Sequence, residues 1–188
     1  MTLPIDFEKY ECDTPTHTSV AEDSTFDSSS VDCPSTISDM VLFNAPPWNG
    51  GLYIIRDPES GLAIALKEGT LGLFPDVYHR GSGGRWRCVE NDRLWLGFKN
   101  AVSGAYIGHN NRGGFVAEAK SHDGWEWFCA RQHPYGGYVL LVKHWSGFLP
   151  MKIGGKDNKE LVVDAEREGG TAWEFIRVNT VLELYRDD

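Results

Sequence analysis

The amino-acid sequence predicts an all-β protein whose folded part contains three copies of one unit. Ser-Gly pairs recur with a step of 43 residues both times, at Ser60, Ser103 and Ser146. A glycine turn followed by Trp and a short apolar run also occurs three times, around Trp86, Trp125 and Trp173. The chain has 21 glycines in 188 residues, which indicates many tight turns. We therefore expect mostly β structure.

The first 45 residues differ in composition from the rest and are predicted to form a disordered tail. The first 49 residues hold nine Asp and Glu but one Lys, so they carry most of the formal net charge of −9. Acidic residues alternate with Ser and Thr, a composition that cannot bury enough apolar surface to offset the entropy of ordering. The short apolar run Met40–Phe43 is the exception and could dock on the folded domain. Two prolines, Pro46 and Pro47, mark the boundary, so the domain is predicted to cover 46–188.

Each repeat reads as four short strands separated by polar, glycine-bearing turns. The predicted first strands are 52–55, 94–98 and 138–142, and each is followed by a basic residue, Arg56, Lys99 and Lys143. The second strands are 62–66, 105–108 and 148–151, and the third are 70–74, 115–119 and 161–165. The fourth strand of each unit contains the Trp motif. The extra length of the third unit falls in the polar stretch 154–159, which is a loop by composition.

Three repeats at 51–92, 93–134 and 135–178 fit either propeller blades or a closed trefoil. A propeller usually has about four to eight blades, so three blades are too few. Twelve strands with pseudo-threefold symmetry instead predict a β-trefoil, a short barrel capped by hairpins. Closure of the barrel also removes exposed sheet edges. The recurring Trp residues are expected to fill the barrel and its cap.

The Trp motif resembles that of the fascin-like β-trefoil repeat, Trp-Glu-x-Phe. Residues 125–128 match it fully, 173–176 match it with a shifted aromatic, and 86–89 have Arg where Glu is expected. The resemblance implies a binding module, with actin as partner when several trefoils are arrayed in tandem. A single trefoil would need self-association to bundle filaments. Ricin B lectins share this fold, but their Gln-x-Trp signature is absent, since the sole glutamine is followed by His133.

Trefoils are also common carbohydrate binders, and such sites need an aromatic platform with Asp, Asn or His beside it. The loops before the Trp strands offer these groups as Tyr78 and His79 in the first unit, and His122, Asp123 and Trp125 in the second. The alternative reading of these residues is turn formation and packing. The third copy, 166–168, has no aromatic residue and is predicted to be inactive.

Trp145 lies at a predicted hairpin turn, where the other two units carry Glu59 and Val102. A large ring at a turn tip either packs against the chain or stays exposed for a partner. Trp145 therefore completes the predicted ligand-binding set, with Tyr135 close to it in sequence.

Other function classes have less support in the sequence. Four histidines, at 109, 122, 133 and 144, fall in the second unit and the start of the third. They could serve a small enzyme, but no pair has the spacing of a metal or catalytic site, so no catalytic residue, metal or cofactor is predicted. The net acidity disfavours nucleic acid.

The N-terminus shows no signal peptide and no run reaches the length of a membrane span, which predicts a cytoplasmic protein. We therefore expect a non-enzymatic intracellular module that binds carbohydrate or protein. The alternatives are an actin-binding cytoskeletal protein and a small enzyme that uses the histidine-rich loops. Cys88 and Cys129 are expected to be buried thiols, with a disulfide between them as the alternative.

Overall fold

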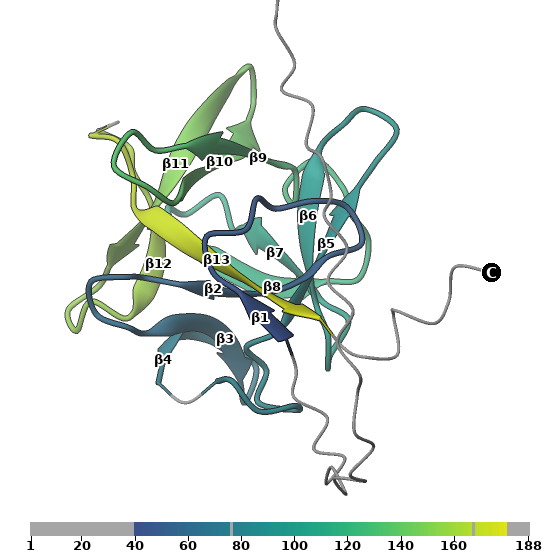
Figure 1. Cartoon of the computed structure of the whole chain (residues 1–188). Helices are drawn as coiled ribbons and strands as arrows, with labels where there is room; N and C mark the ends of the chain where they lie inside the picture. Colours follow the sequence, from purple (N-terminus) through teal and green to yellow (C-terminus); the bar gives the residue numbers. More distant parts are fainter. Residues whose placement is uncertain (1–39, 76, 167, 180–188) are drawn as a thin grey trace, which may run out of the picture. The chain divides into compact units, whose positions relative to one another are not determined.

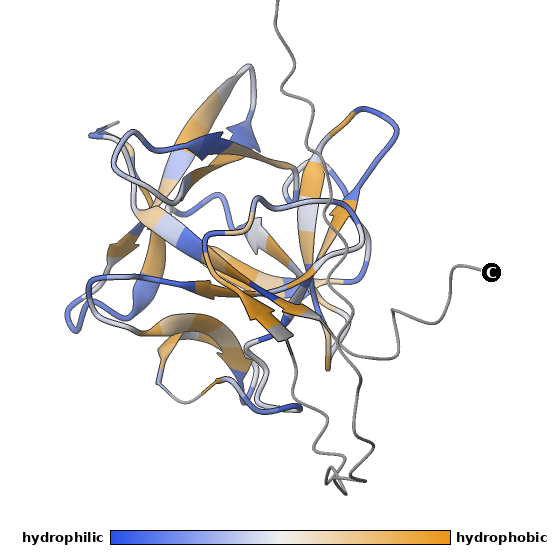
Figure 2. Cartoon of the chain, viewed as in Figure 1, coloured by the Kyte–Doolittle hydropathy of each residue, from blue (hydrophilic) through white to orange (hydrophobic). Residues whose placement is uncertain are grey.

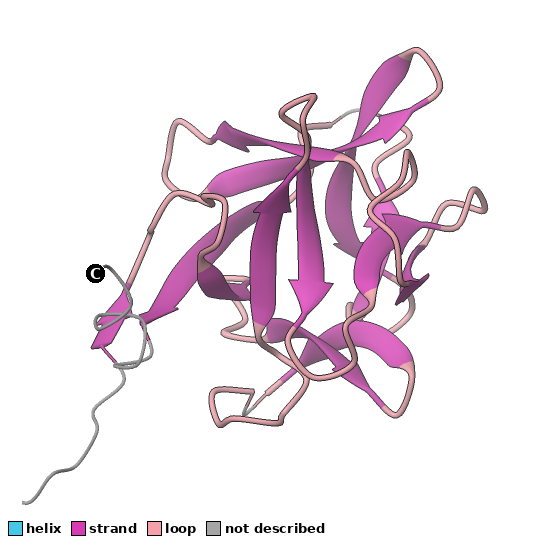
Figure 3. Ribbon diagram, turned by 90° about the vertical axis from the view of Figure 1, so that its right-hand side faces the viewer, coloured by secondary structure: helices cyan, strands magenta, loops and turns pink. Residues whose placement is uncertain are grey.

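The computed structural model describes residues 40–75, 77–166 and 168–179, and these contain β-strands but no helix (Figure 3). The strands are β1 (Met40–Leu42), β2 (Leu52–Arg56), β3 (Ala63–Lys67), β4 (Thr70–Phe74), β5 (Trp86–Glu90), β6 (Leu96–Asn100), β7 (Tyr106–His109), β8 (Phe115–Ala119), β9 (Phe128–Gln132), β10 (Tyr138–His144), β11 (Gly147–Gly154), β12 (Glu160–Val163) and β13 (Ala172–Asn179). No helix of this part of the chain has the length and apolarity needed to cross a membrane.

Six of these strands close into a barrel (Figure 1). Antiparallel pairing runs from β2 to β5, β6, β9, β10 and β13, and β13 pairs back with β2. Each repeat contributes its first and fourth strands to this ring. Because the ring is closed, every barrel strand finds a partner on both sides.

Three hairpins extend the barrel, one for each repeat. They are β3–β4, β7–β8 and β11–β12, and each continues from a barrel strand through a turn. The pairs Arg56↔Ala63, Lys99↔Tyr106 and Val142↔Leu149 define the same register in the three units. These pairs step by 43 residues along the chain, so the Ser-Gly period predicted the repeat correctly. All twelve predicted strands are present, and this arrangement is a β-trefoil.

The same register corrects one sequence prediction. Lys143 follows the first strand of the third unit, and we expected it to match Arg56 and Lys99. The residue that pairs in their place is Val142. Lys143 is therefore equivalent to Asp57 and Asn100, a point that matters for the site described below.

The predicted tail lies outside the described residues, apart from its last part. There β1 pairs antiparallel with the end of β13, so that Val41 lies opposite Val178. The apolar run 40–43 thus adds one strand beside the barrel, in agreement with the docking that its composition suggested.

Large side chains of the barrel strands form the core. Figure 2 shows that apolar residues follow the strands, whereas the connecting loops are hydrophilic. Trp86, Phe128 and Trp173 are fully buried and begin, or nearly begin, the fourth strand of their units. Their register partners on the neighbouring strands are Tyr53, Leu96 and Tyr138. The Trp86 Nε1–H donates to the carbonyl oxygen of Ile64 at 2.8 Å, which satisfies the buried indole.

The expectation that Trp125 is the core Trp of the second unit is wrong. Strand β9 begins at Phe128, which is fully buried at the start of its strand as Trp86 is at the start of β5. Trp125 lies three residues earlier, in the turn before the strand, and is 48% exposed. The second unit buries a Phe near the start of its fourth strand, where the other two units bury a Trp, so matching by residue type misaligned this repeat.

The turns between the first and second strands differ in a way that shapes the site. In the first unit the Asp57 carboxylate accepts hydrogen bonds from the backbone N–H of Glu59 and Ser60 at 3.3 and 2.9 Å. In the second unit the Asn100 side-chain oxygen accepts from the N–H of Val102 and Ser103 in the same manner. The third unit has lysine at this position, which offers no acceptor. Its hairpin instead stays paired to His144↔Gly147 and closes with the two residues Trp145 and Ser146.

Cys88 makes the fold sensitive to alkali. Both Cys88 and Cys129 are free thiols, although Cys129 is only partly buried. Burial raises the pKa of Cys88 from 9.0 to about 12, with a smaller contribution from Glu90. The unfolded thiol therefore ionises at a lower pH than the folded one. It follows that stability is complete below the unfolded pKa and is lost as the pH rises towards the folded pKa.

We expect the free energy of unfolding to fall by roughly 2 kcal/mol between about pH 8 and pH 10.5 through this group, since one pKa unit corresponds to about 1.4 kcal/mol. Urea unfolding of the native protein and of Cys88→Ala at both pH values measures this loss of stability. The variant should show a smaller alkaline loss, and equal losses in the two proteins would contradict the assignment to Cys88.

Candidate functional site

Three cavities lie at equivalent positions around the barrel. Each is formed by the turn after the first strand of one repeat and by the residues before the fourth strand of another. One cavity lies between the β10–β11 turn and the residues before β9. A second cavity lies between the β2–β3 turn and the residues before β13, and a third lies between the β6–β7 turn and the residues before β5. The pseudo-threefold fold thus provides one type of cavity three times, and side chains decide what each can bind.

The cavity between the β10–β11 turn and the residues before β9 has a volume of about 180 Å³ and is lined by aromatic and basic side chains. We call it the aromatic cavity, and it is lined by His109, Asn111, Gly124, Trp125, Lys143, His144 and Trp145. Two of the six predicted ligand-binding residues, Trp125 and Trp145, meet here. They come from different repeats, and each approaches the cavity from a turn.

Trp125 is held in place by His109. Their rings stack with centroids 4.7 Å apart and planes 5° from parallel. His109 is buried at the end of β7, and its Nδ1 accepts the N–H of Asn111 at 3.3 Å. The ring also hydrogen-bonds to the backbone of Lys143, so it links the second repeat to the third. Burial lowers the pKa of His109, and His144 lowers it further, so the neutral ring is favoured.

Trp145 also lines the cavity and is 79% exposed. Its φ of 48° lies in the left-handed region, which is unfavourable for a bulky residue by roughly 1–2 kcal/mol. Glycine would fit this turn better than tryptophan. The chain therefore carries a strained, exposed indole at the edge of the cavity, a combination that is typical of binding and active sites.

Polar groups complete the cavity. The Lys143 ammonium donates to the Trp145 carbonyl oxygen at 3.3 Å and lies over the Trp127 ring, 5.5 Å from its centroid. His144 Nε2 lies 3.3 Å from the side-chain oxygen of Asn111, and its ring is 5.2 Å from that of His109. The cavity thus offers an amine, imidazoles and an amide together with two indoles.

Four of these lining residues, His109, Asn111, Lys143 and His144, were absent from the predicted set. The two histidines were noted in the sequence as part of a cluster but had no spacing that joined them. The repeat register could have identified Lys143, because it replaces the turn-forming Asp57 and Asn100.

Tyr78 and His79 lie in a different place, in the loop between β4 and β5, and both are exposed. The Tyr78 hydroxyl accepts a hydrogen bond from Arg56 at 3.3 Å, while its carbonyl oxygen accepts one from Arg85 at 2.7 Å. Neither residue lines any of the three cavities. The structure does not place these two predicted residues with Trp125 and Trp145.

His122 packs against the fold. Its ring stacks on Tyr106 with centroids 5.5 Å apart, and its Nε2 lies 3.2 Å from the Leu96 carbonyl oxygen. Gly97 leaves room for this ring, since a Cβ there would lie 2.6 Å from the His122 Nε2. Burial lowers the His122 pKa. The neighbouring Asp123 is exposed, and its backbone N–H and carbonyl both bond to Glu126. These contacts are the packing and turn formation that were the alternative to ligand binding.

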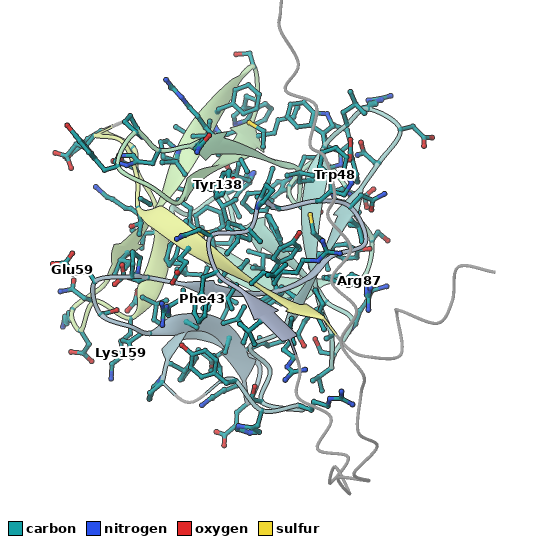
Figure 4. The ribbon with its side chains drawn as sticks, in the orientation of Figure 1. Phe43, Trp48, Glu59, Arg87, Tyr138 and Lys159 are labelled. Carbon is teal, nitrogen blue, oxygen red and sulfur yellow. The ribbon has the colours of Figure 1, made fainter. Side chains whose placement is uncertain are left out.

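The other two cavities have no aromatic lining. The largest, of about 620 Å³, contains two acids, Asp57 and Glu59, with Ser60, Asn158 and Thr171, and Glu59 lies at the outer edge of the molecule (Figure 4). The third, of about 240 Å³, contains Arg80 and Arg85 among small residues. The aromatic cavity therefore differs in character from its two equivalents.

The histidines of the sequence cluster come together only in part. His109 and His144 are adjacent, whereas His122 stacks on Tyr106 and His133 lies against Tyr135. In the described ranges, no group of three or more His, Cys, Asp or Glu side chains is placed to hold a metal ion. The arrangement offers hydrogen bonds and ring faces, which are the means of a binding site.

A scan against protein-family models and a search of curated protein sequences found no match to this chain. Solved structures do resemble it. One is the Macrolepiota procera ricin B-like lectin in complex with lactose, with 15% identity, a TM-score of 0.54 and coverage of 72% of this chain and 100% of the lectin. A second is the BEL β-trefoil, with 11% identity, a TM-score of 0.55 and coverage of 71% and 96%.

A third similar structure is a mosquitocidal holotoxin, with 11% identity, a TM-score of 0.55 and coverage of 69% of this chain. This chain spans only 17% of the holotoxin, whereas it spans nearly all of the two trefoils above. At these identities the likeness concerns the fold, and it confirms the β-trefoil. The resemblance to fascins is thus confirmed for the fold and stays a prediction for the family.

Proposed function

We propose that this protein binds carbohydrate, without catalysis, in the aromatic cavity. The observation that carries the proposal is the meeting of Trp125 and Trp145, two exposed indoles from different repeats, at one cavity with polar groups between them. A sugar ring has an apolar C–H face that packs on an aromatic ring, and hydroxyls that need hydrogen-bonding partners. The cavity supplies both kinds of contact.

The polar partners suit hydroxyl groups. Asn111 offers an amide, and His144 offers an imidazole that can donate or accept. Trp125 is fixed by its stack on His109, so its ring is oriented before a ligand arrives. A preorganised ring loses little conformational entropy on binding, which favours affinity.

The strain at Trp145 also supports a binding role. An indole at a positive φ and almost fully in water contributes little to folding, so packing does not account for it. Among the similar structures, one is a lectin whose complex contains lactose, and this makes carbohydrate a reasonable class to test first. A cytoplasmic location stays a prediction, as does actin binding.

Trp145→Gly gives the sharpest test because it should fold. Glycine relieves the positive φ, which offsets its greater chain entropy, so stability should change by no more than about 1 kcal/mol. We expect saccharide affinity to fall by roughly tenfold or more, as for loss of a central aromatic contact. A glycan array identifies bound saccharides, and calorimetric titration then measures the affinity of each protein.

Tyr135→Ala is the matched control. Tyr135 is 95% exposed but precedes the start of β10, whereas Trp145 follows the end of that strand. It should leave saccharide affinity unchanged. Absence of any array signal for the native protein would refute carbohydrate binding and turn attention to a protein partner. Equal affinity in native protein and Trp145→Gly would refute this cavity as the site.

A further inference from the structure

One position of the repeat reverses its charge between units. The hairpin register makes Asp57, Asn100 and Lys143 equivalent. The first two are buried and use their side-chain oxygens to accept hydrogen bonds from turn amides. A lysine has only donors, so it cannot perform this task. The third unit thus gives up a turn-stabilising side chain and places a cation at the aromatic cavity instead.

Lys143 is held with its ammonium at the cavity. Its Nζ donates to the Trp145 carbonyl oxygen and lies over the Trp127 ring. In residues 40–75, 77–166 and 168–179, no carboxylate lies within ion-pair distance of it. An ammonium has three donors, and one hydrogen bond to a carbonyl leaves capacity for a ligand.

The lining residues around Lys143 add no negative charge. The lining residues include two histidines and no Asp or Glu. Two acids lie near Trp125 in sequence. Asp123 is exposed in the turn, and Glu126 is buried, with a side-chain oxygen 3.2 Å from the Asp123 N–H. Desolvation raises the pKa of Glu126, and its side chain does not line the cavity.

The equivalent cavities of the three repeats do not carry the same charge. The equivalent cavity at the β2–β3 turn contains Asp57 and Glu59 and no basic residue. Since the three cavities share one place in the repeat, the basic lining of the aromatic cavity arises from its own side chains. Such a lining favours an anionic ligand by charge complementarity.

We infer that the aromatic cavity selects an acidic saccharide, whose carboxylate or sulfate pairs with the Lys143 ammonium while a sugar ring packs on Trp145. This inference rests on the proposed carbohydrate binding and narrows its ligand class. A charge-assisted hydrogen bond is stronger than a neutral one, so the acidic form of a saccharide should bind more tightly than its neutral form.

A glycan array that presents each core saccharide in neutral, sialylated and sulfated form tests the inference. We expect the acidic forms to bind roughly tenfold or more tightly than the neutral core, the scale of one charge-assisted hydrogen bond. The preference should weaken as salt is added, since salt screens partly exposed charges. Comparison of the sialylated and sulfated forms shows which acid the cavity takes.

Lys143→Gln should abolish the preference for acidic forms, because a neutral amide cannot form the ion pair that the ammonium forms with an acid. Lys120→Gln is the matched control, because Lys120 likewise donates to a hairpin carbonyl, that of Ser103, at 2.7 Å but does not line the aromatic cavity. It should retain the preference. Equal binding of neutral and acidic forms by the native protein, or a preference that survives in Lys143→Gln, would overturn the inference and leave carbohydrate binding standing. No signal on any glycan would overturn both.

Discussion

Phe128→Ala is expected to lower the free energy of unfolding by about 3–5 kcal/mol, the range for removing a large aromatic from a core. Phe128 is fully buried where β9 begins, and its ring lies 5.7 Å from that of Phe98 and 6.1 Å from that of Phe115. It joins the barrel to the β7–β8 hairpin, so its removal would leave a cavity between two packed elements. Trp125→Ala, three residues away, should cost no more than about 1 kcal/mol because its ring is half exposed.

Chemical denaturation of both variants measures the difference. It also decides which residue of the second repeat corresponds to the buried Trp86 and Trp173. If Trp125→Ala were the more destabilising change, the repeat would have to be aligned by its tryptophans, and Trp125 would belong to the core. Phe128→Trp adds a further check, since the position accepts Trp in the other two units and should lose less stability than Phe128→Ala.

Gly83→Ala is the second change with a large expected effect. Gly83 has a φ of 79°, and a Cβ there would lie 2.2 Å from the carbonyl oxygen of Leu66. Its own carbonyl accepts hydrogen bonds from the Leu66 N–H at 3.1 Å and from the buried Asn100 side chain at 2.8 Å. Alanine would have to move this backbone. We expect a loss of roughly 2–5 kcal/mol, from a left-handed residue of about 1–2 kcal/mol and overpacking of about 1–3 kcal/mol.

Gly81→Ala separates the two contributions. Gly81 has nearly the same φ, 84°, but no atom lies within 4 Å of the position of its Cβ. It should lose only the roughly 1–2 kcal/mol of the left-handed conformation. Thermal or urea unfolding of the two variants side by side measures the excess at Gly83. Equal losses would mean that the close approach to Leu66 has no energetic consequence.

The regular step of the Ser-Gly pairs predicted the repeat because it reports the register of real hairpins. The turns at Asp57 and Asn100 use the same side-chain-to-backbone hydrogen bonds, with Ser60 and Ser103 at corresponding places. Turn chemistry is local, and a sequence can therefore reveal it. The tryptophans were a poorer guide, because a barrel interior requires bulk rather than a particular aromatic, and Phe128 satisfies it.

Sequence reasoning found only part of the site for a related reason. It named Trp125 and Trp145 as ligand candidates, but it also expected Trp125 to fill the core, and it joined Trp125 to His122, its neighbour in the chain. The structure turns His122 onto Tyr106 and brings His109 beneath Trp125 instead. Side-chain direction in a turn depends on where the following strand begins, and that start was misplaced by three residues.

The sequence by itself determined the three repeats, the order of twelve strands and the β-trefoil, since these follow from alternating apolar runs and local turn signals. Only the tertiary structure decided which loops share a cavity. Trp125 precedes β9 in the second repeat and Trp145 follows β10 in the third, and the antiparallel pairing of these two strands brings them together. It also decided that Lys143 occupies the place of two turn-forming residues, because hairpin register depends on pairing with a strand farther along the chain.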